Sequence, residues 1–221
     1  MPNNTQLPDA KSHSADARLD AANYHRNIEP ILNALRPRLP TTPGHILEVG
    51  SGTGQHITSF AQQFPLHTWH PTDLNQESLA SIRAWTDALG LTNVAPPISL
   101  DASTVPWPIG TDGQPPMTLD GIFSANVIHI SPWSVTQGIL SAAGRHLRAG
   151  TSAFFYGPFM RDGVHTAPSN AAFDQSLRAR NDAWGVRDLA DLETFAKSHA
   201  LTLVDIVDMP ANNFVVEFKR A

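Results

Sequence analysis

Apolar residues recur along the chain with two spacings, and the alternation between the two predicts an α/β fold. Between residues 28 and 35 they recur every three or four positions, which predicts a helix that ends at about Arg36, with Asn27 as its N-cap. A short, mostly apolar run at residues 45–49 predicts the first strand. Helical spacing returns over residues 54–64, so a strand is followed by a helix through a tight turn.

This alternation continues to the end of the chain. Further strands are expected over residues 66–72, 98–100, 119–126, 151–156, 201–207 and 214–218. Further helices are expected up to Gly90 and after Ser131, Ser169 and Asp188, each of which can cap a helix. The last two strands have the pattern of an antiparallel closing pair, whereas residues 157–170 are expected to form a long polar loop.

Composition limits the domain count and the class of partner. The chain has 221 residues, no internal repeat and no linker, so residues 16–221 are expected to form one domain behind a flexible tail at residues 1–15. A net charge of -5 without a long basic run argues against a nucleic-acid groove or an anionic membrane surface. We expect a monomer or homodimer whose partner is a small molecule.

Two absences exclude further classes of function. The chain contains no cysteine, which excludes disulfides, cysteine-based metal sites and a thiol nucleophile. Its first 20 residues lack the apolar core of a signal peptide, so a soluble cytoplasmic protein is expected. The histidines His67 and His70 are three apart on a predicted strand with His56 nearby, but positions i and i+3 of a strand point to opposite faces, so no metal site is expected.

The turn after the first strand carries the strongest chemical signal. Its sequence, Glu-Val-Gly-Ser-Gly-Thr-Gly over residues 48–54, places an acid and then three glycines at alternate positions between a strand and a helix. Glycine tolerates positive φ and lets a ligand lie against bare backbone, and the amides of the following helix point toward the same space. A ligand site is therefore expected at this turn, although a Gly-rich turn without a ligand is the plainer alternative.

Known phosphate-binding patterns do not fit this turn. A dinucleotide fingerprint needs a third glycine where Gln55 stands, and a phosphate P-loop needs a Lys that does not follow here. Two acids end the next strands: Asp73 is placed to accept both ribose hydroxyls of an adenosine, and Asp101 follows the third strand. Each has a structural alternative, since Asp73 or Asn75 could cap the next helix and Asp101 could be a turn residue.

The motif resembles motif I of the class I S-adenosylmethionine (SAM) methyltransferases. That resemblance implies a Rossmann-like α/β fold, with helices on both faces of a seven-stranded, mostly parallel sheet that has one antiparallel C-terminal strand as a reversed edge strand. Four further runs, over residues 26–32, 125–133, 156–159 and 162–174, are similar to the family of methyltransferase-like protein 26, long described as a domain of unknown function. The similarity spans residues 22–220, and it implies SAM dependence without identifying an acceptor.

The resemblance implies a cofactor site and an N-terminal helical cap that folds over it. The resemblance implies that Asp101 accepts a hydrogen bond from the adenine amino group. It also implies that the N-terminal segment from Tyr24 to Asn27 acts as a lid. The residues expected to bind the cofactor are Glu48, Gly50, Ser51, Gly52, Asp73, Leu74, Asp101, Ala102, Asn126, Arg26 and Asn27.

The acceptor is expected beneath the polar loop at the carboxyl ends of the strands. His165 is the preferred base or substrate ligand, with His129 as an alternative that could equally be a packed core ring. Tyr156 could donate a hydrogen bond from its strand end. The residues expected to bind the acceptor are Tyr24, Arg161, Asp162, Ser169 and Asn170.

The function that follows is methyl transfer from SAM to an O or N nucleophile of a small molecule. Because the cofactor brings the electrophile and the leaving group, the protein mainly supplies alignment and a dry site, and a base helps only with a hydroxyl or protonated amine. A SAM-binding sensor or partner protein without activity is the alternative. An NAD-dependent oxidoreductase is disfavoured by Gln55 and by the terminal strand pair.

Overall fold

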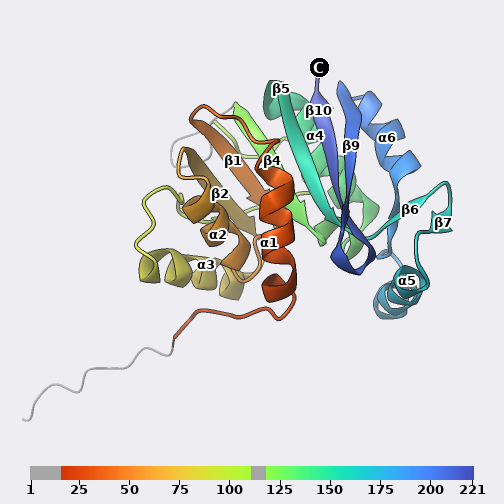
Figure 1. Ribbon diagram of the computed structural model, residues 1–221, viewed down its shortest axis with the longest axis horizontal. Helices are drawn as coiled ribbons and strands as arrows, with labels where there is room; N and C mark the ends of the chain where they lie inside the picture. The colour runs from red at the N-terminus through yellow and green to blue at the C-terminus, as the bar shows by residue number, and fades with distance from the viewer. Residues whose placement is uncertain (1–15, 111–117) are drawn as a thin grey trace, which may run out of the picture.

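The computed structural model of the protein describes residues 16–110 and 118–221. The tail expected at residues 1–15 lies outside this part of the chain. A twisted central sheet carries helices on both faces (Figure 1). The expected Rossmann-like architecture is confirmed, and the described residues form a seven-stranded sheet with the order β3-β2-β1-β4-β5-β10-β9.

The sheet is parallel except at one strand. β10 runs antiparallel to both β5 and β9, while the remaining neighbours pair in parallel. The reversed strand was expected at the edge, but it lies one place inside because β9 pairs on its outer side. The strands are β1 (Gly44–Val49), β2 (His67–Asp73), β3 (Ile98–Ser99), β4 (Leu119–Ala125), β5 (Leu147–Gly157), β9 (Leu201–Met209) and β10 (Asn213–Arg220).

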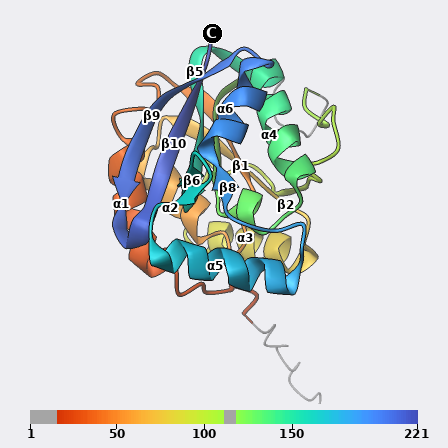
Figure 2. The same cartoon turned by 90° about the vertical axis from the view of Figure 1, so that its right-hand side faces the viewer.

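Two apolar cores lie on the two faces of this sheet. One joins α1, α2 and α3 to the sheet through side chains such as Phe60 and Trp69, and the other joins α4 and α6 through side chains such as Phe155 and Phe218. Figure 2 shows α1 on one side of the sheet and α4 with α6 on the other. The helices are α1 (Tyr24–Leu35), α2 (Gln55–Gln63), α3 (Gln76–Ala88), α4 (Trp133–His146), α5 (Pro168–Arg180) and α6 (Leu189–Lys197), with short 3₁₀ turns η1 (Val127–His129) and η2 (Pro210–Asn212).

The segment expected to be a long loop contains a hairpin instead. β6 (Phe159–Arg161) and β7 (Val164–His165) pair antiparallel, and β8 (Arg187–Asp188) completes a small three-stranded sheet. The turn residues Asp162 and Gly163 have φ of 52° and 77°. An Asp-Gly pair with two positive φ values is a typical two-residue hairpin turn, and this signal was present in the sequence.

Three of the expected helix caps are wrong. α1 begins at Tyr24, so Asn27 lies inside the helix, where its side chain is buried and contacts other elements. α4 follows Pro132, and the Ser131 hydroxyl donates to the Val127 carbonyl instead of capping. α5 follows Ala167, which places Ser169 within its first turn.

Two caps were predicted correctly. Asp188 caps α6 by accepting from the Ala190 amide, and Asn75 caps α3 by accepting from the Glu77 amide.

Across the part of the chain that the structure describes, none of the helices combines the length and the apolar character that a membrane span requires.

Candidate functional site

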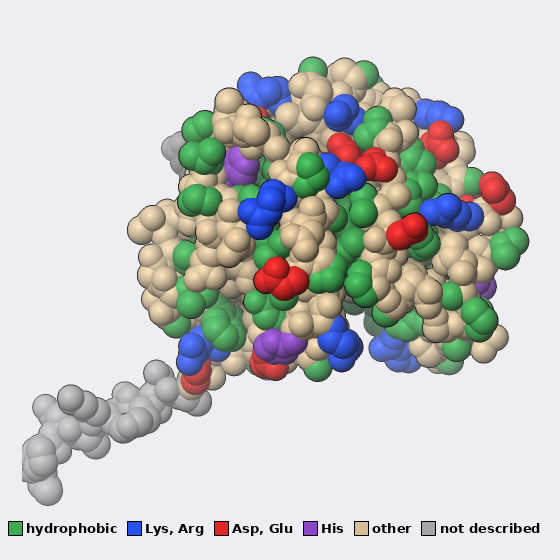
Figure 3. Space-filling view, in the orientation of Figure 1, with side chains coloured by type: hydrophobic (Ala, Val, Ile, Leu, Met, Phe, Trp, Pro, Cys, Tyr) green, Lys and Arg blue, Asp and Glu red, His purple; other side chains and the backbone are tan. Residues whose placement is uncertain are grey.

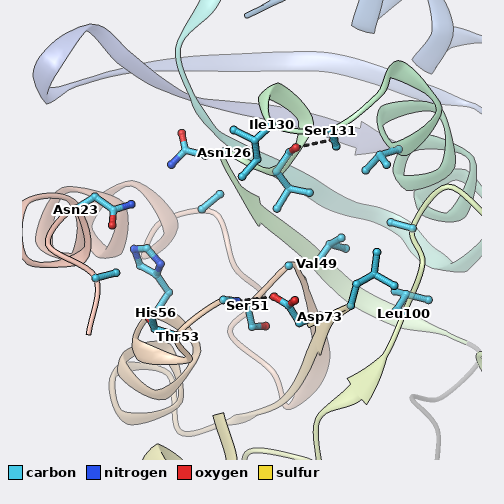
Figure 4. A pocket seen from close by; sticks show the side chains of 18 of the residues that line it. Asn23, Val49, Ser51, Thr53, His56, Asp73, Leu100, Asn126, Ile130 and Ser131 are labelled. Atoms are coloured by element: carbon cyan, nitrogen blue, oxygen red, sulfur yellow. Dashed lines mark hydrogen bonds between the residues drawn. The ribbon is translucent and has the colours of Figure 1, made fainter. Parts of the chain in front are cut away.

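A cavity of about 440 Å³ opens at the carboxyl ends of β1, β2 and β4 (Figure 4). This is the edge where parallel α/β sheets bind ligands, because the turns that leave the strands expose backbone there. Its wall is formed by Ala21, Asn23, Tyr24, Val49, Gly50, Ser51, Gly52, Thr53, His56, Asp73, Leu74, Leu100, Asp101, Ala102, Ala125, Asn126, Val127, Ile130, Ser131 and Val135.

The glycine turn forms the floor of the cavity. Gly50 has φ of 68°, and a Cβ there would lie 2.4 Å from Cγ2 of Val127. The turn therefore lies directly against the loop that leaves β4, and no larger residue fits between them. Gly52 has φ of 54°, and a Cβ on it would meet nothing within 4 Å. The missing side chain leaves room for a ligand to lie against backbone.

Asp73 connects the end of β2 to this turn. Its Oδ2 accepts a hydrogen bond from the Gly52 amide at 2.8 Å, and its Oδ1 accepts from the Asn75 amide at 2.9 Å. A carboxylate offers about four acceptor positions, so roughly two remain. Because Asp73 lines the cavity, they are available to a diol or a similar pair of donors.

Glu48 lies beneath the turn, outside the cavity wall. The side chain is almost completely buried, and its Oε2 has no hydrogen-bond partner among the described residues. Burial raises the pKa of Glu48 to about 8, a hydrogen bond from Ser51 opposes this, and the negative charge of Asp73 adds to it. At neutral pH the Glu48 carboxyl group is therefore mainly protonated, and it supports the turn from below through Ser51.

Apolar residues dominate the side of the cavity beyond Asp73. Leu74, Leu100, Ala102 and Val135 lie there, as Figure 4 shows for Leu100. Asp101 belongs to the same wall, and its Oδ1 accepts from both the amide and the hydroxyl of Ser103. The turn role anticipated for Asp101 is therefore present, and it coexists with a place in the cavity wall.

The opposite end of the cavity is formed by the chain before β1. Tyr24 lines it and donates to or accepts from the Ser59 hydroxyl at 2.7 Å. Asn27 lies behind it, buried, with Oδ1 2.8 Å from Nε2 of His56. Arg26 is exposed and does not line the cavity. Of the three expected N-terminal contacts, the structure thus brings Tyr24 to the wall.

The expected catalytic histidines lie elsewhere. His129 is fully buried, and burial lowers its pKa to about 3, with the positive charge of Arg187 acting in the same direction. Its Nδ1 accepts from the Arg187 amide, and its ring meets Phe159 edge-on. His165 lies on β7, with Nε2 3.7 Å from Asp174. Neither ring lines the cavity.

The expected acceptor ligands form a second group around β6, β7 and α5. Arg161 lies over the ring of Phe214, and Asp162 occupies the hairpin turn. Ser169 and Asn170 make hydrogen bonds to Asn212. None of the four lines the cavity.

Tyr156 is also buried outside the cavity wall. Burial raises its pKa, while hydrogen bonds from Asn27 and Asn213 and the charge of Arg26 lower it. The phenol is therefore tied to α1 and β10 and supports the wall from behind.

Of two residues that the sequence did not identify as part of the site, one lies in the cavity wall and the other lies behind it. His56, in the first turn of α2, lines the cavity beside Asn23 (Figure 4). Gln55 supports the wall from behind: its Oε1 accepts from the Ala21 amide at 2.8 Å, and its Nε2 donates to Asp20 at 2.7 Å. Both roles depend on the N-terminal segment returning across α2, which no local pattern encodes.

No group of three or more potential metal ligands comes together among the residues that the structure describes. The rings of His45 and His70 do lie close together, with Nδ1 of His45 3.0 Å from Nε2 of His70. This pair lies at the other end of the sheet from the cavity, at the start of β1.

Comparison with protein families gives a match over almost the whole chain. A family model described as "Protein of unknown function (DUF938)" matches residues 18–220.

Several solved structures with the same fold carry the name methyltransferase. An O-methyltransferase family 2 protein from Planctomyces limnophilus, in complex with apigenin, superimposes with a TM-score of 0.73 at 17% identity, over 90% of this chain and 58% of that chain. A putative O-methyltransferase from Nostoc punctiforme gives a TM-score of 0.74 at 14% identity, over 90% and 58%. The SAM-dependent methyltransferase SibL gives 0.69 at 20%, over 90% and 56%. The chain thus spans little more than half the length of these proteins, and it shares their Rossmann-like methyltransferase fold.

Proposed function

The chain belongs to the family described as protein of unknown function DUF938, and from that premise we propose that it is a SAM-dependent methyltransferase acting on a small molecule. The finer similarity to methyltransferase-like protein 26 is part of this proposal. The fold supports it, since proteins named as O-methyltransferases superimpose on 90% of this chain with TM-scores of 0.73 and 0.74.

One observation carries the proposal: the charge of the cavity wall. Among the described residues the wall contains two carboxylates, Asp73 and Asp101, and no Lys or Arg. Such a wall favours a ligand with cationic centres and disfavours a pyrophosphate. SAM carries a sulfonium and an ammonium group, whereas a nicotinamide dinucleotide carries two phosphates.

The residues present fit the adenosyl part of this cofactor. Asp73 has two free acceptor positions for the ribose hydroxyls, and Gly52 leaves its face of the turn open. In this proposal Asp101 accepts from the adenine amino group, and Leu100 and Ala102 beside it cover the base. In this assignment Gly50, Ser51, Ala102 and Asn126 complete the contact surface, with Leu74 at the cavity mouth.

Bound SAM supplies the methyl electrophile and the leaving thioether. The chain then holds the acceptor in line with the methyl group and excludes water, which accounts for roughly 7 to 11 kcal/mol of barrier in well-aligned systems. An O or N nucleophile would pass its proton to solvent or to a base as it takes the methyl group. His165, His129 and Tyr156 lie outside the cavity, so in this proposal they act only if the acceptor binds toward β6 and β7.

The acceptor we propose is a small molecule rather than a nucleic acid. The chain has a net charge of -5, and on the face shown in Figure 3 acidic and basic side chains are interspersed without a continuous basic patch. The molecule bound in the structure of one protein with this fold, apigenin, is also small. Arg161, Asp162, Ser169 and Asn170 remain the proposed acceptor ligands on the β6 and β7 side, with Tyr24 at the cavity.

The test is binding followed by turnover. Calorimetry with purified protein should give heat with SAM and with S-adenosylhomocysteine, and none with NAD⁺ or NADH. Protein incubated with methyl-labelled SAM and a low-molecular-mass cell extract should then transfer label to an extract component. If the protein binds SAM but transfers no label to extracts from cells grown on different nutrients, the alternative of a SAM-binding sensor is favoured. Absence of nucleoside binding would end the proposal.

A further inference from the structure

The end of the cavity away from Asp73 contains an ionisable side chain, His56, whose second ring nitrogen is not hydrogen-bonded to any described residue. His56 lies at the wall there, flanked by the edge of the Tyr24 ring at 5.4 Å between centroids and stacked on Phe60 at 5.9 Å. Figure 4 shows His56 and Asn23 on one side of Ser51, and Asp73 and Leu100 on the other. A ligand whose ribose lies at Asp73 therefore extends its other end toward His56.

The tautomer of His56 is set by a chain of hydrogen bonds behind the wall. The Asn27 side chain lies between Tyr156 and His56, and its Oδ1 is the atom that faces His56. An amide oxygen only accepts, and Nε2 of His56 lies 2.8 Å from it. Nε2 therefore carries the hydrogen and Nδ1 carries the lone pair. The structure records no partner for Nδ1 among the described residues.

The ring is neutral under ordinary conditions. Burial lowers the pKa of His56 to about 4, and the positive end of α2 acts in the same direction. The charged or titratable groups around it are Tyr24, Asp20 and His25 from the N-terminal segment and α1, and Tyr156 through Asn27. Asp20 is the acid among them, and its contacts are His25 and Gln55. A neutral imidazole with a free Nδ1 is an acceptor, so it suits a ligand group that donates.

We propose that His56 recognises the α-ammonium group of the cofactor's methionyl tail, which donates a hydrogen bond to Nδ1, with Asn27 and Tyr156 as the residues that position the ring. This inference rests on the proposed function and concerns the same cavity. The methionyl carboxylate would then face the free amides at the start of α2, where an anion is favoured. His56 thus distinguishes the complete cofactor from nucleosides that lack an amino-acid tail.

The test compares three probes by calorimetry: S-adenosylhomocysteine, the same compound without its α-amino group, and 5′-methylthioadenosine. The variant His56→Phe keeps the ring stacked on Phe60 and removes the acceptor. A hydrogen bond between a charged group and a partly buried partner contributes about 10- to 100-fold in affinity. We expect His56→Phe to lower the affinity for S-adenosylhomocysteine by that factor. The affinities for the other two probes should change by less than about twofold, which is the precision of such a comparison. His45→Gln, at the far end of the sheet, is the matched control.

Proton linkage provides the second measurement. A neutral His56 that accepts from the ammonium group takes up no proton, so binding heats in buffers of different ionisation enthalpy should give the same proton count for wild type and His56→Phe. If wild type takes up about one more proton than the variant, His56 pairs with the carboxylate and the inference is wrong. The inference is also wrong if His56→Phe lowers the affinity for all three probes by the same factor. If wild type binds none of the probes, the proposed function itself fails.

Discussion

The carboxylate of Asp73 accepts a hydrogen bond from the backbone amide of Gly52 at 2.8 Å, which joins the end of β2 to the middle of the glycine turn. One side chain thereby fixes the shape of the turn and presents two free acceptor positions to the cavity. The sequence predicted an acid at this strand end and a glycine turn beside it. Their direct contact makes the two features one structural unit.

Replacing Asp73 by Ala should therefore affect both shape and binding. The variant loses the two acceptor positions proposed for ribose and releases the Gly52 amide. Hydrogen bonds to a charged group contribute about 1.5 to 3 kcal/mol each, so we expect S-adenosylhomocysteine to bind at least roughly 100-fold more weakly. Calorimetry measures this directly. Asp87→Ala, an exposed acid on α3, is the control, and unchanged affinity in Asp73→Ala would refute the ribose assignment.

Glu48 should make the stability of the protein depend on pH. Its pKa is about 8 in the folded chain and 4.5 for the free group, so the folded state keeps a proton that the unfolded state releases between these values. The stabilisation is complete below pH 4.5, and it is lost as the pH rises toward about 8. The slope is at most about 1.4 kcal/mol per pH unit.

The variant Glu48→Gln separates this effect from all other titrations. Gln carries no titrating proton, so the difference in unfolding free energy between wild type and variant should shift against wild type as the pH increases. Urea unfolding at several values between about pH 5 and pH 8 measures it, over the range set by the two pKa values. Parallel curves for the two proteins would show that Glu48 is ionised in the fold.

Gln55 should control how the N-terminal segment closes the cavity. Its side chain holds the Ala21 amide and the Asp20 carboxylate, and it stands where a dinucleotide fold would have glycine. Gln55→Ala removes both bonds and the one that its Oε1 accepts from the Thr53 hydroxyl at 3.0 Å, and the bond from the Ala21 amide alone contributes about 1 kcal/mol. We expect faster hydrogen exchange at the Ala21 amide and several-fold faster release of S-adenosylhomocysteine in stopped flow. Gln63→Ala, exposed at the end of α2, should change neither, and equal effects in both variants would count against this role.

The parts of the site that follow from sequence are those built by short segments. The strand, the glycine turn and Asp73 were predictable because each is a local pattern at the end of a parallel strand. The hairpin of β6 and β7 was also encoded locally, by Asp162 and Gly163, but the polar side chains around it suggested a ligand loop instead.

The remaining features depend on contacts between distant segments. Asn is a residue type that often caps helices, but α1 begins one turn before Asn27. The Asn27 side chain instead contacts His56 of α2 and Tyr156 of β5. The role of His56 depends on the packing of α1 against α2. Asn27 of α1 contacts Nε2 of His56, and the ring lines the cavity. Such pairings are set by tertiary packing, which overrides local preference.

Gly52 and Gly90 allow the cavity to be tested independently of backbone strain. Their φ values are 54° and 61°, and a Cβ on either would meet nothing within 4 Å, but only Gly52 lines the cavity. Alanine at such φ costs about 1 to 2 kcal/mol, so Gly52→Ala and Gly90→Ala should lose similar stability in urea. An added methyl group in a filled site costs about 1 to 3 kcal/mol, which predicts roughly 5- to 140-fold weaker binding of S-adenosylhomocysteine by Gly52→Ala alone. Equal affinities in the two variants would mean that the ligand does not lie against this turn.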